Sequence, residues 1–284
     1  MNYTQDVIDS DGARIAARDY GGSGPALVLM HGAGLDQSSL FPLVGRLRGT
    51  VRVVTFDFRG HGASARSPWT LAHAVRDLAS VVAAYDLSSP VVGGHSLGGM
   101  VAVQYGLEHP ACRAVINIDG HGRGRAEQYV GHSETEVRRW WETQQRRIDR
   151  LTSGPGTAAL KAVLRLAGRT PTATAEAARQ VVAEIETLDL FALYRQVPCP
   201  LLIFNATGQQ HGPVMKIMFG RGLPLLAAYR EGLRRDLLTL AQERPSTSVA
   251  TISASHMLIR THPDIVARRI TEFLLDVPPV SAHA

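Results

Sequence analysis

Short apolar runs rich in valine, leucine and isoleucine alternate with amphipathic stretches along the first 120 residues of the chain. Runs of this length, bounded by glycine, proline or polar residues, are typical of strands buried in a parallel sheet. The predicted strands are 26–30, 51–56, 91–92 and 114–118. The intervening stretches predict helices at 38–47, 70–85 and up to about residue 109. The alternation therefore predicts an α/β fold with a mostly parallel central sheet and helices on both faces.

The pattern changes between residues 121 and 197, where helical spacing of apolar residues replaces the strand runs. Strand character returns at 201–204 and 248–252, and Pro263 begins a final helix that reaches about residue 275. We therefore predict an α/β core formed by residues 1–120 and 198–284, with a helical cap formed by residues 121–197.

Composition excludes several classes of protein. The net charge of +5 comes from arginines spread along the chain without a nucleic-acid-binding motif, so we expect no nucleic-acid partner. No run approaches the roughly 18 apolar residues of a membrane span, and the first residues lack signal-peptide features, which predicts a cytoplasmic protein with no membrane partner. Cys112 and Cys199 have no metal-ligand spacing, so we expect no metal and no cofactor. The sequence leaves a homodimer open.

The most informative segment is Val-Val-Gly-Gly-His-Ser-Leu-Gly-Gly at residues 91–99, which contains Gly94-x-Ser96-x-Gly98. A serine on a tight turn between a strand and a helix needs very small residues two positions before and after it. Such a turn exposes the Ser96 hydroxyl and directs the Leu97 amide toward the reacting centre. An ordinary glycine-rich turn could have the same pattern, so the surroundings must decide.

An aliphatic hydroxyl at neutral pH needs a base within hydrogen-bond reach, and neutral imidazole has suitable basicity. His256 is the best candidate because it follows a predicted strand, at the sheet edge where Ser96 also emerges. The oxyanion of a tetrahedral intermediate needs two donors, for which we propose the backbone amides of Ala33 and Leu97. The amide of Gly32 is a weaker alternative to Ala33.

Four motifs, in this order, resemble those of the α/β-hydrolase fold superfamily over residues 12–275. They are His31-Gly32-Ala33-Gly34, Asp57-Phe58-Arg59-Gly60-His61-Gly62-Ala63-Ser64, the segment Gly94 to Gly99, and Ser255-His256 followed by His262-Pro263. The resemblance implies an oxyanion loop at Ala33, a helical cap between strands six and seven, and a catalytic-histidine loop at His256. In that family, histidines at the positions of His31, His61 and His95 usually hold loops together.

The acid departs from the common family pattern. Most members place an aspartate just after strand seven, but no carboxylate occurs here between Asp189 and Glu231. Asp119, at the end of strand six, offers a replacement, as in haloalkane dehalogenases and zearalenone-type lactonases, which the chain resembles in this respect. Asp36 and Glu231 remain weaker alternatives. Asp119 could instead cap the first turn of the predicted cap.

The predicted substrate pocket is apolar. We expect Trp140 and Trp141 of the cap, Met257 beside the base and His121 at the start of the cap to contact substrate. A long apolar connection between strands seven and eight could also reach over the site; its apolar residues include Met215, Ile217, Met218, Phe219, Tyr229, Leu233 and Leu237. Taken singly, most of these side chains are equally well explained as helix-packing core.

Together the residues predict a serine hydrolase with Ser96 as nucleophile, His256 as base and Asp119 as acid. Its partner would be a small-molecule ester, lactone or thioester with a bulky apolar group, cleaved through an acyl-enzyme. A carbon–carbon bond hydrolase or an acyltransferase would use the same groups. A hydrolase-like receptor for a small ligand is a further alternative, because such a receptor can retain an intact triad.

Overall fold

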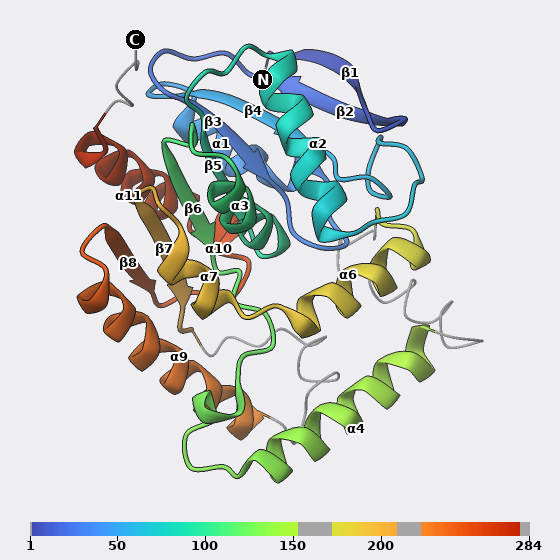
Figure 1. Ribbon diagram of the computed structural model, residues 1–284, viewed down its shortest axis with the longest axis vertical. Coiled ribbons are helices and arrows are strands. Elements are labelled where there is room, and N and C mark those ends of the chain that lie inside the picture. Colours follow the sequence, from blue (N-terminus) through green and yellow to red (C-terminus); the bar gives the residue numbers. More distant parts are fainter. Residues whose placement is uncertain (1, 153–171, 209–222, 279–284) are drawn as a thin grey trace.

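The computed structural model describes residues 2–152, 172–208 and 223–278, and within them eight strands form one central sheet (Figure 1). The strand order is β1-β2-β4-β3-β5-β6-β7-β8. Strands β4, β3, β5, β6, β7 and β8 run parallel to one another. Strands β1 and β2 form an antiparallel hairpin, and β2 pairs antiparallel with β4. The bounds are β1 Thr4–Ser10, β2 Ala13–Asp19, β3 Ala26–Met30, β4 Arg52–Phe56, β5 Val91–His95, β6 Ala114–Ile118, β7 Leu201–Ala206 and β8 Thr247–Ile252.

Helices cover both faces of the sheet and divide the core into two layers. Alternate residues of a strand point to opposite faces, so Val28 of β3 packs in one layer and Leu27 and Leu29 in the other. The first layer includes residues of α2 (Leu71–Ala84), α3 (Leu97–Glu108), α7 (Leu190–Gln196) and α9 (Leu223–Glu243). The second includes residues of α1 (Phe41–Leu47), α10 (Leu258–Thr261) and α11 (Pro263–Asp276). This arrangement confirms the predicted fold class.

Local sequence signals explain where several helices begin. The hydroxyl of Thr70 accepts a hydrogen bond from the amide of His73, so Thr70 is the N-cap of α2 as the sequence predicts. Pro263 is the first residue of α11. An N–H group at this position would have no acceptor within the helix, so proline costs no hydrogen bond there. Of the described helices, none combines the length and the apolar character needed to cross a membrane.

Between β6 and β7 the described residues form helices joined by loops, and none of them forms a strand. These helices include η2 (Ala126–Gln128), α4 (Glu134–Thr152), α6 (Ala175–Thr187) and α7. Figure 1 shows α4 and α6 away from the sheet, whereas α7 lies beside α3 and buries Phe191 and Tyr194 in the core. The bounds that we predict for a separate cap, residues 121–197, stay a prediction.

Candidate active site

Ser96 occupies the predicted turn between a strand and a helix, because β5 ends at His95 and α3 begins at Leu97. Its backbone has φ +54° and ψ −116°, a combination that residues with side chains rarely adopt and that is common at functional turns. A side-chain carbon at Gly98 would lie 2.6 Å from the carbonyl oxygen of Met30, so only glycine fits there. The Ser96 amide donates to the carbonyl of Ile118 at 2.9 Å, which fixes the turn against the end of β6.

His256 and Asp119 form a hydrogen-bonded pair beside this turn. Nδ1 of His256 lies 2.7 Å from Oδ2 of Asp119, and the amide of Ala206 donates to the other carboxylate oxygen at 2.8 Å. Asp119 follows β6 with φ +58°, a second strained position at the same sheet edge. Its side chain is 11% exposed, compared with 49% for His256. The acid is therefore largely shielded from solvent, while the imidazole remains open to it.

The environment of Asp119 favours its ionised form. Burial on its own would raise the pKa of this carboxyl, but the hydrogen bond and charge of His256, with smaller effects from His121 and the Ala206 amide, hold the pKa below its usual value. A carboxylate only accepts hydrogen bonds, so Nδ1 of His256 carries the proton that joins the pair. The remaining ring nitrogen, Nε2, is then an acceptor, which is the form a general base requires.

The candidate oxyanion loop lies against the nucleophile. A side-chain carbon at Gly32 would lie 3.3 Å from Cβ of Ser96, and the Leu35 amide donates to the Gly32 carbonyl to close a tight turn around Ala33. Leu97 is the first residue of α3, where backbone amides have no acceptor within the helix. The structure therefore places Gly32, the residue before Ala33, beside Ser96. Oxyanion binding by the amides of Ala33 and Leu97 stays a prediction.

The other candidate acids lie elsewhere. Asp36 caps η1 (Gln37–Leu40) by accepting a hydrogen bond from the Ser38 amide at 2.9 Å. Glu231 lies on α9 with its side chain 57% exposed and pairs with Arg234 at 2.7 Å. Of the three carboxylates weighed from the sequence, Asp119 is the one that the structure places against His256.

A different carboxylate, that of Asp57, stabilises the turn after β4. Asp57 is buried and accepts hydrogen bonds from the amides of Gln37 and Ala63 at 2.7 and 2.9 Å. Its neighbour His61 accepts from the Gly34 amide at 3.3 Å, so this turn also supports the oxyanion loop. Asp57 therefore has its hydrogen bonds within the turn and the loop beside it.

The candidate substrate residues are spread over several elements. The rings of Trp140 and Trp141 on α4 lie 4.7 Å apart, and the Trp141 indole donates to the Tyr129 hydroxyl at 2.9 Å. The side chain of His121 is 6% exposed. Its Nε2 donates to the carbonyl of Phe204 at 2.9 Å and lies 3.7 Å from a carboxylate oxygen of Asp119. Met257 is half-buried next to His256. Substrate contact stays a prediction for Trp140, Trp141, His121 and Met257.

Part of the predicted apolar connection cannot be placed, because Met215, Ile217, Met218 and Phe219 lie outside the described residues. Within α9, Leu233 and Leu237 are buried in the core. The Tyr229 hydroxyl is 3.4 Å from the His121 carbonyl, so α9 contacts the start of the segment between β6 and β7. That segment also returns to the oxyanion loop, since the amide of Thr172 donates to the Gly34 carbonyl at 3.2 Å.

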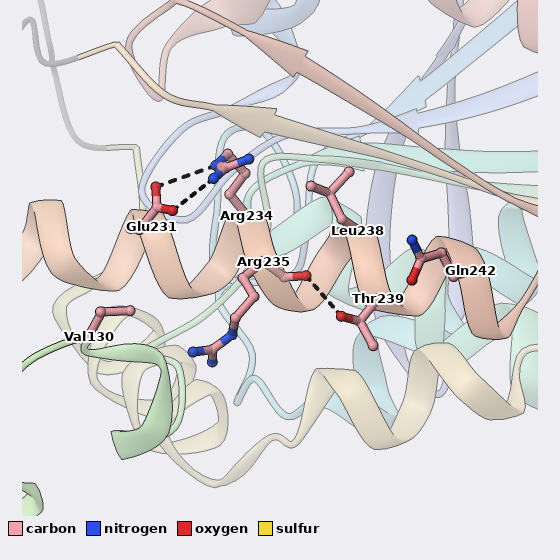
Figure 2. A pocket seen from close by; sticks show the side chains of 7 residues that line it. All are labelled: Val130, Glu231, Arg234, Arg235, Leu238, Thr239 and Gln242. Atoms are coloured by element: carbon pink, nitrogen blue, oxygen red, sulfur yellow. Dashed lines mark hydrogen bonds and ion pairs between the residues drawn. The ribbon is translucent and has the colours of Figure 1, made fainter.

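A hollow of about 380 Å³ lies on the surface of α9, and Figure 2 shows the side chains that line it. It is lined by Val130, Glu231, Arg234, Arg235, Leu238, Thr239 and Gln242. Ser96, Asp119 and His256 do not line it, so it is separate from the candidate active site. Within the described ranges, no group of three or more histidine, cysteine or acidic side chains is arranged to hold a metal ion.

Ala206 contributes to the site although no sequence motif marks it. Its amide donates a hydrogen bond to the Asp119 carboxylate. Every residue except proline has such an amide, so the residue type at this position gives no hint of the contact. The only available hint was the absence of an acid after β7, which left this strand end free to support an acid supplied by β6.

Comparisons with known proteins give a consistent family. A profile described as the Alpha/beta hydrolase family matches residues 27–269. The putative carbamate hydrolase RutD of Caulobacter vibrioides is 38% identical over 102 residues, which are 34% of this chain and 38% of that protein. The Magnesium-chelatase 30 kDa subunit of Rhodobacter capsulatus is 35% identical over 95 residues, which are 32% of this chain and 34% of that protein. The chain thus spans well under half the length of these curated relatives.

Solved structures show the same fold over nearly the whole chain. A thermophilic esterase from Thermogutta terrifontis superposes with a TM-score of 0.69 at 21% identity, covering 98% of this chain and 99% of the esterase. The enol-lactonase from Burkholderia xenovorans LB400 gives a TM-score of 0.64 at 19% identity, covering 97% of this chain and 100% of the lactonase.

Proposed function

Because the chain belongs to the alpha/beta hydrolase family, we propose that it is a serine hydrolase acting on an ester, lactone or thioester of a bulky apolar small molecule. One observation carries the proposal. A largely shielded carboxylate, Asp119, lies 2.7 Å from Nδ1 of a half-exposed histidine, His256, at the sheet edge where the strained turn holds Ser96. A histidine held by a carboxylate in this way activates a serine hydroxyl that lies within its reach.

In the proposed reaction, the Ser96 oxygen attacks the substrate carbonyl carbon while Nε2 of His256 accepts the hydroxyl proton. Asp119 holds the imidazole in the required tautomer and stabilises its positive charge. The amides of Ala33 and Leu97 bind the negative oxygen of the tetrahedral intermediate, and each such donor contributes roughly 10²–10³ in rate. The leaving group departs with the proton from His256, and water then hydrolyses the acyl-enzyme.

The substrate class rests on the surroundings of this pair. Met257 follows the base directly, and the segment between β6 and β7 contacts the oxyanion loop through Thr172. The aromatic pair Trp140 and Trp141 belongs to that same segment. An apolar acyl or lactone group is the occupant that such side chains favour. The esterase and the enol-lactonase with the same fold agree with this class.

Fluorophosphonate labelling tests the proposal directly, because an activated serine displaces fluoride from the reagent and forms a stable phosphonate ester. We expect one adduct, at Ser96 by peptide mass spectrometry, and no adduct in Ser96→Ala. Ser248→Ala is the matched control, since Ser248 is an exposed serine on β8. An adduct at another serine, or no adduct on the folded wild-type protein, would show that the nucleophile is wrong.

A chromogenic ester distinguishes the alternatives that share the triad. An acyl-enzyme predicts a burst of one product molecule per active site followed by steady turnover. Transfer of the acyl group to an added alcohol in preference to water would identify an acyltransferase. Turnover slower than ligand dissociation would identify a receptor.

A further inference from the structure

His95 makes the contact that holds the loop of the proposed base. Its Nε2 lies 2.7 Å from the backbone carbonyl oxygen of His256, across a separation of 161 residues. The two imidazole rings are tilted by 42° with their centroids 4.6 Å apart. His95 is the last residue of β5, which belongs to the rigid centre of the sheet. A loop that follows the edge strand β8 is therefore attached to the strand that presents the nucleophile.

The chemistry of this contact fixes the form of the ring. A carbonyl oxygen can only accept, so Nε2 of His95 carries the hydrogen and Nδ1 is left as a lone pair. Burial lowers the pKa of His95 to about 3, which keeps the ring neutral and the donor in place at neutral pH. His95 is 1% exposed, so its ring is shielded from water.

The other edge of the ring lies against the oxyanion loop. A side-chain carbon at Gly32 would lie 2.9 Å from Nδ1 of His95 and 3.3 Å from Cβ of Ser96. Nδ1 itself has no hydrogen-bond partner in the described part of the protein. The ring thus fills the space between the oxyanion loop at Gly32 and the base loop at His256, directly before Ser96.

We propose that His95 is a positioning residue, whose Nε2 hydrogen bond sets where His256 stands relative to Ser96. This inference rests on the proposed function, in which His256 is the base. The hydrogen bond is made to the backbone of His256, the same residue that carries the imidazole. A shift of this backbone therefore moves the base directly. Misplacement of a catalytic group by about 1 Å can cost about 10²-fold in rate.

Three substitutions at position 95 separate the donor from the bulk of the ring. In His95→Gln the amide nitrogen is as many bonds from the backbone as Nε2 of histidine, so the donor is kept. His95→Asn is polar but too short, and His95→Leu fills space without a donor. We expect kcat on a chromogenic ester to fall by about 10- to 100-fold in the Asn and Leu variants, with KM changed less than about twofold. His95→Gln should recover most of that loss.

A spectroscopic readout does not depend on turnover. The proton shared by Nδ1 of His256 and Asp119 is expected as a low-field NMR resonance in the wild type and in His95→Gln, and as a broadened or absent resonance in His95→Asn and His95→Leu. A purely structural role would lower Tm while leaving kcat per labelled site and this resonance as in the wild type.

Unchanged kcat and an unchanged resonance in folded His95→Leu would overturn the proposal. If the Asn and Leu variants do not fold, His95→Gln decides. Loss of both kcat and the low-field resonance in that folded variant would show that the Nε2 donor does not position His256. Failure of the wild-type protein to react with fluorophosphonate would instead refute the proposed function, while the resonance would still test the positioning of His256.

Discussion

Asp119 and Glu231 are two carboxylates in two very different regions of the molecule. Asp119 stands at the carboxyl edge of the sheet, 11% exposed, with one oxygen on His256 and the other on the Ala206 amide. Glu231 stands on the outer surface of α9, 57% exposed, paired with Arg234 beside a hollow (Figure 2). Both have a lowered pKa, Asp119 against the penalty of burial and Glu231 through its arginine neighbour in water.

The difference shows that neither a hollow nor a lowered pKa identifies an active site. The charged side chains in the hollow on α9 are Glu231, Arg234 and Arg235, which solvent screens, and exposed ion pairs contribute little. At the sheet edge, by contrast, each oxygen of Asp119 has a fixed donor, and two elements far apart in the sequence supply them. Fixed donors around a buried charge are what a catalytic acid requires.

Replacing Asp119 should give the largest effect. Asp119→Asn keeps the size of the side chain but favours the wrong tautomer of His256, which is expected to lower kcat by about 10⁴-fold. Steady-state kinetics on a chromogenic ester measures this loss. Asp36→Asn is the control, because Asp36 caps η1 and does not contact His256. Full kcat in a folded Asp119→Asn protein would mean that another group supports the base.

The amide of Ala206 offers a smaller test of the same site. Ala206→Pro removes the N–H group that donates to Asp119, whereas the adjoining contact to β8 uses the Thr207 amide and is retained. A hydrogen bond to a charged group contributes about 1.5–3 kcal/mol, so kcat should fall by roughly 10- to 100-fold. Ala206→Ser keeps the amide and serves as the control. Equal kcat in both variants would show that the second oxygen of Asp119 needs no donor.

Much of this fold could be predicted, because buried parallel strands have strong local signals. Strands β3 and β6 have the bounds expected from their apolar runs, and Thr70 caps α2 as expected. The hairpin of β1 and β2 was not predicted, since most of β1 is exposed and its sequence shows no clear apolar alternation. The available signal was Asp11-Gly12, where both residues have positive φ, as in a two-residue hairpin turn.

The candidate site was predicted less completely than the fold. Ser96, His256 and Asp119 could be proposed because the chemistry restricts residue type and the fold restricts position. The contact from Nε2 of His95 to a backbone carbonyl depends on the path of a loop 161 residues away, which no local pattern encodes. The sequence alone left both Asp119 and Glu231 as candidates for the acid. Solvent exposure separates the two, and it is known only from the structure.

Buried histidines at the sheet edge should make stability depend on pH. Burial lowers the pKa of His31 and His61 to about 4, and each ring accepts a backbone amide on one nitrogen, so protonation is disfavoured in the folded state. In the unfolded chain the pKa returns to about 6.5, so that state binds protons first as the pH falls. The stability that these neutral histidines contribute is therefore fully present above pH 6.5 and is lost as the pH falls below it.

His61→Gln should flatten that dependence. At 1.36 kcal/mol per pKa unit, one such histidine accounts for about 2 kcal/mol of stability lost between pH 7 and pH 5. Urea unfolding at pH 7, 6 and 5 measures the difference in slope between the variant and the wild type. His132→Gln, outside this cluster, should leave the slope as in the wild type. Parallel curves for His61→Gln and the wild type would refute a buried neutral His61.

Substitutions in the hollow on α9 should give the smallest effect. Glu231→Gln and Arg234→Gln remove an exposed ion pair that solvent and salt already screen, so kcat should stay within about twofold of the wild type. Kinetics and thermal melting at low and high salt would measure this, with Asp119→Asn assayed in parallel. A drop in kcat approaching that of Asp119→Asn would place Glu231 in the catalytic machinery and reverse the contrast between the two carboxylates. A small loss of Tm confined to low salt fits an exposed pair, because screening removes such an interaction as the ionic strength rises.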